Sequence, residues 1–151
     1  MASKFNVRVY GLCIRRGSVL LSDELFNGIK MTKFPGGGLD YGEGTIDCLK
    51  REFQEEKIGE IRAVEHFYTT DFFQKALFFD STQLLSIYYK ANVITYAEFP
   101  VSEVALEVSV TNNQKLRWTS LAHLKPEDLT FPIDQVVTQM LKDIAQKEGW
   151  F

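Results

Sequence analysis

The sequence lacks the features that mark several classes of protein. Among its 151 residues are only 2 cysteines and 2 histidines, and no apolar run approaches the ~20 residues that span a bilayer. Residues 1–16 alternate polar and apolar side chains and have no continuous apolar segment, so no secretory signal is visible. Cys13 and Cys48 fit neither a zinc spacing nor a disulfide framework. We therefore expect two buried thiols in a reducing, cytoplasmic protein.

An excess of positive charge is also missing. The 17 Lys and Arg residues against 20 Asp and Glu residues give a net charge of −3, and the pI is near 5.4. Proteins that bind duplex nucleic acid or an anionic membrane present a basic surface. The charge balance therefore argues against both partners. If the protein handles phosphates, it must neutralise them locally, through a metal ion or a few placed cations.

The remaining composition is that of a globular protein with many aromatic side chains. Hydrophobic residues make up 45% and charged residues 25%, and the length predicts one domain over residues 1–151. Aromatic residues reach 13%, with 12 Phe, 6 Tyr and 2 Trp. We see no repeats, low-complexity segment or linker that would divide the chain.

Alternating and β-branched segments predict several strands. A glycine-containing turn at residues 16–18 separates the first two and predicts a hairpin. The segment from Phe34 to Gly38 holds one proline and three glycines, which suit the interior of neither a helix nor a strand. The expected strands cover residues 5–14, 19–21, 60–68, 83–94 and 115–119.

Two segments have helical periodicity, so the pattern as a whole predicts a mixed α/β domain. In the first, Ile46, Leu49 and Phe53 share one face, Thr45 is the expected N-cap, and Gly59 is the expected left-handed stop. The last helix follows residues 131–132. Its expected cap is Asp134, and its expected buried side consists of Val136, Val137, Met140, Leu141 and Ile144.

Three carboxylates gather on one side of the first expected helix. Glu52, Glu55 and Glu56 are three or four residues apart, where like charges cost about 0.2–0.5 kcal/mol per pair. A divalent cation reverses this cost, because magnesium prefers several oxygen ligands. Arg51 lies four residues before Glu55 and can hold it in one rotamer. The alternative is a solvated acidic face that pairs with neighbouring lysines and arginines.

The spacing around these carboxylates resembles a known motif. Residues 37–59 read GGLDYGEGTIDCLKREFQEEKIG, which is similar to the Nudix box. The box is written as Gly, five residues, Glu, seven residues, Arg-Glu, an apolar residue, any residue, Glu-Glu, any residue, Gly and an apolar residue. Ile58 and Gly59 stand in exchanged order at its end. The matching positions are Gly37, Glu43, Arg51, Glu52, Phe53, Glu55 and Glu56.

The resemblance implies a Nudix hydrolase with an α/β/α sandwich and a mixed β-sheet. Such enzymes use Mg²⁺ or Mn²⁺ to hydrolyse the pyrophosphate bond of a nucleoside diphosphate linked to another moiety, such as ADP-ribose, a nucleotide sugar or an oxidised nucleoside triphosphate. It implies that Arg51 orients a glutamate and that Glu43 supports the loop. The implied metal ligands are the carbonyl of Gly37 and the side chains of Glu52, Glu55 and Glu56, and the implied catalytic residues are Arg51, Glu52 and Glu55.

The resemblance leaves several assignments open. Glu52 is the first candidate for the general base within the box, and an additional acid is expected among Glu98, Glu103 and Glu107. The alternative function is a non-catalytic Nudix-fold module that senses a ligand. A further alternative, an isomerase of prenyl diphosphates, requires a cysteine and further acids that we cannot identify in this chain.

An aromatic segment is the candidate for substrate specificity. Phe72, Phe73 and Gln74 lie in an expected loop, where exposed aromatic side chains call for an explanation. We expect this segment to contact a small-molecule nucleoside diphosphate derivative or, alternatively, to form the interface of a homodimer.

Overall fold

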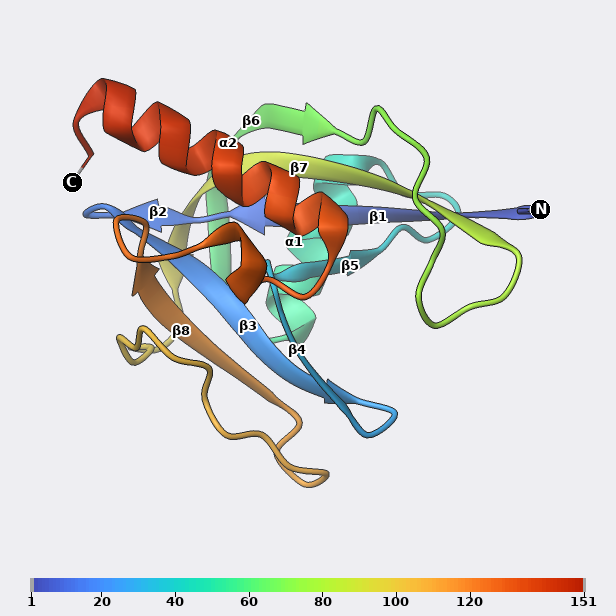
Figure 1. Cartoon of the computed structure of the whole chain (residues 1–151), viewed down its shortest axis with the longest axis horizontal. Helices are drawn as coiled ribbons and strands as arrows, with labels where there is room; N and C mark the ends of the chain where they lie inside the picture. Colours follow the sequence, from blue (N-terminus) through green and yellow to red (C-terminus); the bar gives the residue numbers. More distant parts are fainter. Residues whose placement is uncertain (1, 151) are drawn as a thin grey trace. The chain divides into compact units, whose positions relative to one another are not determined.

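Two separate β-sheets organise the chain, and each belongs to its own unit (Figure 1). The computed structural model describes residues 2–150. The first unit combines the chain up to Leu12 with Gly36–Ala97, and the second combines Cys13–Pro35 with the chain from Glu98 onward. Within residues 2–150, neither α-helix has the length and apolar character required to pass through a bilayer.

The first unit holds a mixed sheet with one helix on its surface. The strand order is β5-β1-β7-β6, in which β1 and β7 are parallel and the other neighbours are antiparallel. The helix packs closely on β1, because a Cβ on Gly11 would lie 3.2 Å from a ring carbon of Phe53 and 3.4 Å from a methyl of Leu49. The elements are β1 (Lys4–Leu12), β5 (Gly36–Gly38), α1 (Thr45–Glu55), β6 (Gly59–Thr69) and β7 (Thr82–Thr95).

The second unit is built on an antiparallel sheet in which β3 pairs with β2, β4 and β8. Its elements are β2 (Ile14–Arg15), β3 (Ser18–Phe26), β4 (Ile29–Lys33), β8 (Gln114–Ser120), the 3₁₀ turn η1 (Pro126–Asp128) and α2 (Pro132–Glu148). A buried ion pair links two strands, with Arg117 Nε 2.8 Å from Asp23 Oδ2. The same carboxylate accepts bonds from the Thr32 hydroxyl and the Leu106 backbone N–H. These bonds fasten the segment before β8 to its sheet.

The predicted strands are confirmed, with two differences in the first half of the chain. The strand expected over residues 5–14 is interrupted at Cys13, so it forms both β1 and β2. The sequence analysis also did not predict β4 or the turn that joins it to β3. Asn27 and Gly28 both have positive φ in that turn, at 50° and 76°. An Asn-Gly pair between two strands is a recognised hairpin signal, so this turn could have been predicted from the sequence.

The glycine-rich segment contains a strand, which corrects our expectation that residues 34–38 would avoid one. Gly36–Gly38 forms β5 at the edge of the first sheet, antiparallel to β1. A Cβ on Gly36 would collide with the carbonyl oxygen of Val9. The three glycines are compatible with a strand here for two reasons. An edge strand pairs with a neighbour on one side only, and the close approach of Gly36 to Val9 leaves no room for a larger side chain.

The expected ends of α1 are each corrected. Thr45 is the first helical residue and Gly44 is the N-cap, and Ile46 is exposed although we placed it on the buried face. At the other end Lys57 takes the left-handed conformation, with φ of 57°, in place of Gly59. Gly59 instead begins β6, where a Cβ would collide with the carbonyl oxygen of Ile94.

The final helix is confirmed, but its cap is corrected. Phe131 is the N-cap of α2, and Asp134 lies buried inside the first helical turn. Proline is favoured at the first helical position, so the helix starts three residues earlier than it would if Asp134 were its N-cap. Val136 is exposed, whereas Val137 and Leu141 are fully buried as expected.

The two cysteines match their prediction as buried thiols. Cys13 belongs to the second unit and Cys48 to the first, and both are free and buried. Burial raises the pKa of each thiol to about 12. Because the thiolate is the reactive form, neither group is activated for redox chemistry.

Candidate functional site

Glu52 and Gly37 meet where α1 lies against the edge strand β5. A Cβ placed on Gly37 would fall 2.5 and 2.6 Å from the two carboxylate oxygens of Glu52. The Glu52 side chain is only 16% exposed. The missing side chain at Gly37 therefore creates the space that this carboxylate occupies.

Arg51 donates hydrogen bonds to three of the predicted positions and to one further backbone carbonyl. Its Nη1 donates to Glu52 Oε1 at 3.0 Å and to Glu55 Oε2 at 3.2 Å. Its Nε and Nη2 donate to the Glu43 carboxylate at 3.0 and 2.6 Å, and Nη2 also donates to the carbonyl of Gly38 at 3.0 Å. A planar guanidinium with five donors suits this arrangement, because it contacts several acceptors in fixed directions.

The arginine network changes the acid–base properties of its members. Hydrogen bonding from Arg51, helped by the backbone N–H of Asp40, lowers the pKa of Glu43 from its usual 4.5 to about 2. Hydrogen bonding to Glu43 in turn raises the pKa of Arg51. Both groups are therefore charged at neutral pH, and Arg51 keeps a fixed positive charge beside Glu52 and Glu55.

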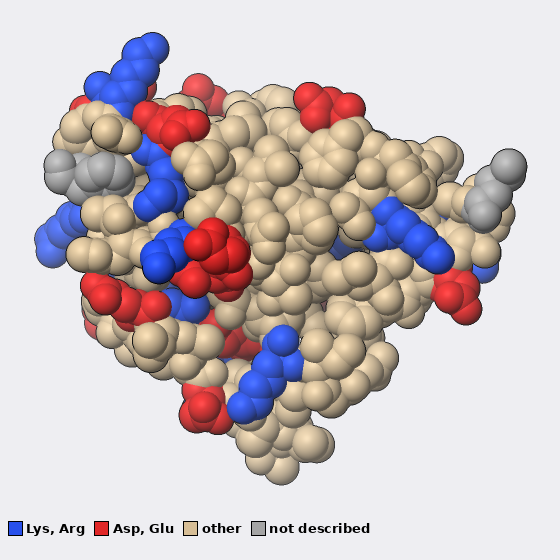
Figure 2. Space-filling view, in the orientation of Figure 1, with Lys and Arg blue, Asp and Glu red and all other residues tan. Residues whose placement is uncertain are grey.

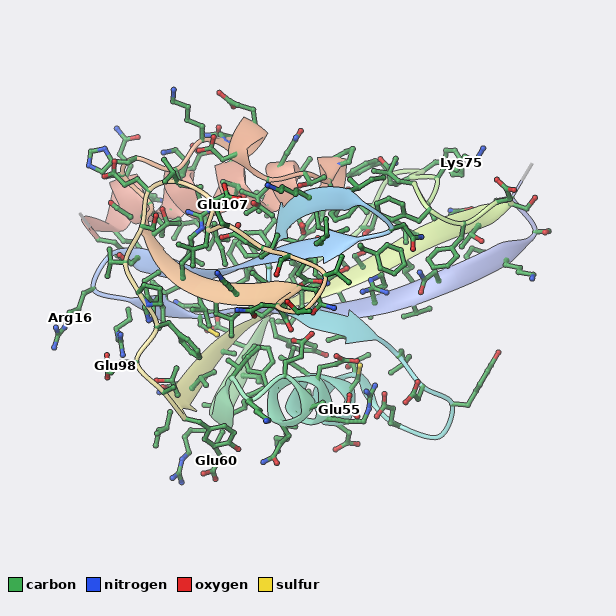
Figure 3. The ribbon with its side chains drawn as sticks, turned by 90° about the horizontal axis from the view of Figure 1, so that it is seen from below. Arg16, Glu55, Glu60, Lys75, Glu98 and Glu107 are labelled. Carbon is green, nitrogen blue, oxygen red and sulfur yellow. The ribbon has the colours of Figure 1, made fainter. Side chains whose placement is uncertain are left out.

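The donor chemistry of this cluster suits a hard divalent cation. Glu52 and Glu55 converge on one guanidinium nitrogen, and the backbone of Gly37 lies against the first of them. Carboxylate and carbonyl oxygens are the ligands that Mg²⁺ and Mn²⁺ prefer. Figure 3 shows Glu55 on α1 with its side chain on the helix surface. Across residues 2–150, no three His, Cys, Asp or Glu side chains are gathered closely enough to hold a metal ion, so a cation bound by Glu52, Glu55 and Glu56 would have to draw their side chains together.

The predicted substrate segment lies apart from Glu52. Gly37, Val9, Ile87 and Thr69 are register partners that form one row across the sheet. Three strand spacings separate the ends of this row by about 14 Å. The exposed side chains of Phe72 and Phe73 and the half-buried Gln74 follow beyond Thr69, in the loop between β6 and β7.

The candidate acids outside the box all belong to the second unit. Glu98, Glu103 and Glu107 are exposed. Glu107 pairs with Lys30 at 3.1 Å, and Glu103 lies 3.7 Å from the ring of His123. These contacts give Glu103 and Glu107 ordinary surface surroundings.

Two neighbours of Arg51 escaped the sequence analysis. Asp40 Oδ2 lies 3.4 Å from Arg51 Nη2, and Cys48 Sγ accepts a weak bond from the same nitrogen at 3.7 Å. Cys48 lies three residues before Arg51 on the helix, a spacing that places side chains side by side. Asp40 had no comparable signal, because its position depends on the path of the loop before α1.

The lowered pKa of Glu43 predicts an acid-sensitive contribution to stability. Because the carboxylate binds its proton less readily when folded, its stabilising effect is complete above the unfolded value of 4.5 and is lost as the pH falls towards about 2. We expect Glu43→Gln to have a lower Tm than the wild type at pH 7, and the difference to shrink as the pH falls through this window. Thermal melts at several pH values test this. The exposed Glu65→Gln is the control, and a Tm difference that does not change with pH would contradict the prediction.

Comparisons with known proteins identify one protein family. The model of the NUDIX domain family matches residues 4–140. No curated protein matches the chain. Among solved structures, a NUDIX hydrolase from Nitrosomonas europaea has a TM-score of 0.67 at 18% identity, covering 91% of this chain and 90% of its own.

Two further structures share the fold. The MutT NUDIX hydrolase from Burkholderia pseudomallei has a TM-score of 0.67 at 17% identity, covering 91% of this chain and 98% of its own. A protein described as an ADP compounds hydrolase has a TM-score of 0.66 at 16% identity, covering 97% and 76%. The predicted mixed α/β, Nudix-like fold is thus confirmed. Since the family model spans nearly the whole chain, the protein belongs to the Nudix family and is a Nudix hydrolase.

Proposed function

We propose that this protein hydrolyses the pyrophosphate bond of a nucleoside diphosphate linked to another moiety, with Mg²⁺ or Mn²⁺ as cofactor. The observation that carries this proposal is the placement of the Glu52 carboxylate against Gly37, with Arg51 bonded to both Glu52 and Glu55. The structural neighbours described as a MutT protein and an ADP compounds hydrolase support a small nucleotide derivative as the substrate.

The proposed ligands of the cation are oxygen atoms of the box. They are the carbonyl of Gly37 and the carboxylates of Glu52, Glu55 and Glu56. When bound, the cation neutralises the charge of the pyrophosphate and lowers the pKa of water. The net charge of −3 is compatible with a phosphate substrate only through such local neutralisation.

We assign separate tasks to the side chains around this site. Glu52 is the proposed general base, which takes a proton from the attacking water. Arg51 orients Glu52 and Glu55 through Nη1, while Glu43 holds the guanidinium from its other side. Glu43 is a positioning residue, since its carboxylate is occupied by Arg51 and by the backbone of Asp40.

The loop that holds Phe72, Phe73 and Gln74 retains its two proposed roles, substrate contact and dimer interface. Its separation from Gly37 by three strand spacings favours the interface. We also propose that both units act as a single Nudix domain, which the match over residues 4–140 supports. A cytoplasmic location is proposed as well, because free buried thiols suit a reducing compartment.

A panel of substrates tests the proposed reaction. Phosphate products are measured with ADP-ribose, dinucleoside polyphosphates, nucleotide sugars and oxidised deoxynucleoside triphosphates, each in the presence of Mg²⁺ or Mn²⁺. We expect turnover of at least one class, loss of turnover with a chelator, and recovery when the metal is restored. Tight binding of one compound without hydrolysis of any would instead support the non-catalytic sensing module.

A further inference from the structure

The start of α1 is bonded to the sheet through two side-chain hydroxyls. Thr45 is the first residue of the helix, and its hydroxyl oxygen lies 2.6 Å from the hydroxyl oxygen of Tyr89 on β7. Both residues are half-buried. A threonine hydroxyl near a helix start commonly bonds to backbone groups of its own segment. Here it is bonded to a strand, so this hydrogen bond joins two elements of the first unit.

The ring of Tyr89 is held by its neighbours on the sheet. Gly11 on β1 and His66 on β6 are its register partners, so these residues share the sheet face on which α1 packs. The His66 ring stands edge-on to the Tyr89 ring, with 6.0 Å between the ring centres. The Tyr89 hydroxyl therefore has a defined position from which to bond Thr45.

The bond fixes a degree of freedom that the apolar contacts of α1 leave open. Leu49 and Phe53 pack on Gly11, and apolar contacts have no preferred direction. A hydrogen bond, by contrast, weakens steeply when its angle departs from linear. The bond between Thr45 and Tyr89 therefore sets how far α1 lies along the sheet.

Glu52 lies on the same side of α1 as Thr45. The two residues are seven positions apart, which is about 20° short of two turns and about 10.5 Å along the helix axis. A slide of α1 would therefore be passed on to Glu52. This side chain has little room to move, because its carboxylate occupies the space left by the missing side chain at Gly37.

Placement of Glu52 is important because the chain offers a phosphate little long-range attraction. The net charge is −3, and on the face drawn in Figure 2 acidic side chains lie among the basic ones. Steering of an anion requires an extended positive surface. Turnover in the proposed reaction therefore relies on a few groups at the site, and a small displacement of Glu52 should lower kcat.

From these observations we propose that Tyr89 is a positioning residue, whose hydroxyl acts through Thr45 to hold the Glu52 carboxylate beside Gly37. The effect on turnover rests on the proposed function, in which Glu52 takes a proton from water. The placement of Glu52 depends on neither the substrate nor the reaction.

Tyr89→Phe tests the hydroxyl, because it leaves the ring and its contact with His66 intact. We expect kcat to fall by about tenfold, the effect of losing one hydrogen bond between uncharged groups, with little change in KM. Tyr96→Phe is the matched control. Its hydroxyl accepts a bond from Gln54 of the same helix at 2.9 Å, but both residues are exposed and water can replace that bond. Equal losses of kcat in the two variants would mean that the bond only stabilises the helix, and would overturn the proposal.

Double variants show whether Tyr89 acts through Thr45 and Glu52. In Gly37→Ala the Glu52 carboxylate has already left its place, so adding Tyr89→Phe should lower kcat little further. Thr45→Val should match Tyr89→Phe, and combining the two should be no worse than either. Thr45→Ser keeps the hydroxyl and should lose much less. A full additional loss of kcat in the Gly37→Ala background would contradict the assignment.

The backbone N–H of Gly37 reports the placement of Glu52 without any turnover. Gly37 lies on β5 and Tyr89 on β7, with β1 between them, so Tyr89→Phe should change the amide chemical shift of Gly37 only if Glu52 moves. We expect NMR spectra to show this change for Tyr89→Phe and not for Tyr96→Phe. An unchanged Gly37 signal in Tyr89→Phe would overturn the proposal. If the wild type hydrolyses no compound in the panel, the proposed function alone fails, and the Gly37 signal still decides the role of Tyr89.

Discussion

Glu52→Gln is expected to lower kcat by about 10² to 10⁴ while leaving the protein folded. The substitution preserves the size of the side chain, so the space beside Gly37 stays filled. It removes the negative charge that the proposed cation needs and the oxygen that accepts a proton from water. Steady-state hydrolysis of the best substrate in the panel, together with a thermal melt, measures the effect on kcat and Tm separately.

The appropriate comparison for Glu52→Gln is a glutamate outside the network. Glu60 is exposed on β6 and lies near Arg62, at 3.5 Å, so Glu60→Gln removes the same charge from the same unit. We expect its kcat to match the wild type. If both variants were equally active, Glu52 would not be the general base or an essential ligand. If both were equally impaired, the effect would reflect the overall charge and not the site.

Gly37→Ala is expected to reduce kcat by about 100-fold, because a displacement of about 1 Å can have this effect on a catalytic group. The added methyl group would occupy the place of the Glu52 carboxylate, which would have to leave its position between Gly37 and Arg51. The φ angle of Gly37 is not in the left-handed region, so alanine introduces no backbone strain there. The loss should therefore appear in kcat with little change in Tm.

Gly38→Ala provides a control one residue away in the same strand. A Cβ at Gly38 meets only Arg8 Nη1, at 3.7 Å, which is ordinary contact. We expect Gly38→Ala to keep most of the wild-type kcat. Equal kcat values for the two alanine variants would show that the approach of Glu52 to Gly37 does not matter for turnover.

Helical spacing predicted one contact of Arg51, the one with Glu55, because a helix brings positions four apart together. The contact with Glu43 was implied only by the resemblance to the Nudix box, since Glu43 lies before the helix. The space beside Gly37 could not be predicted, since it arises from contact between β5 and α1. The position of Asp40 likewise depends on the loop path. The strand register that aligns Gly37 with Thr69 across the sheet could not be predicted either. Pairing between strands that are distant in sequence does not follow from the local sequence of either strand.

The end of α1 shows why tertiary packing overrides a local signal. Gly59 is a good helix stop by itself, but the chain turns two residues earlier, at Lys57. The early turn lets the N–H of Ile58 reach the carbonyl of Phe53 at 2.8 Å and buries Ile58 completely. A left-handed Lys57 costs about 1–2 kcal/mol. Burial of an isoleucine contributes about 1.5–3 kcal/mol, so the early turn is favoured.

The division of the two cysteines between the units gives each unit an internal reporter of its own opening. Cys48 lies on the buried face of α1 in the first unit, and Cys13 is the buried residue between β1 and β2 in the chain, where the second unit starts. A thiol reagent reaches neither until the surrounding structure opens. When modification is faster than reclosing, its time course, assigned by peptide mass, gives the opening rate around each cysteine without any engineered label.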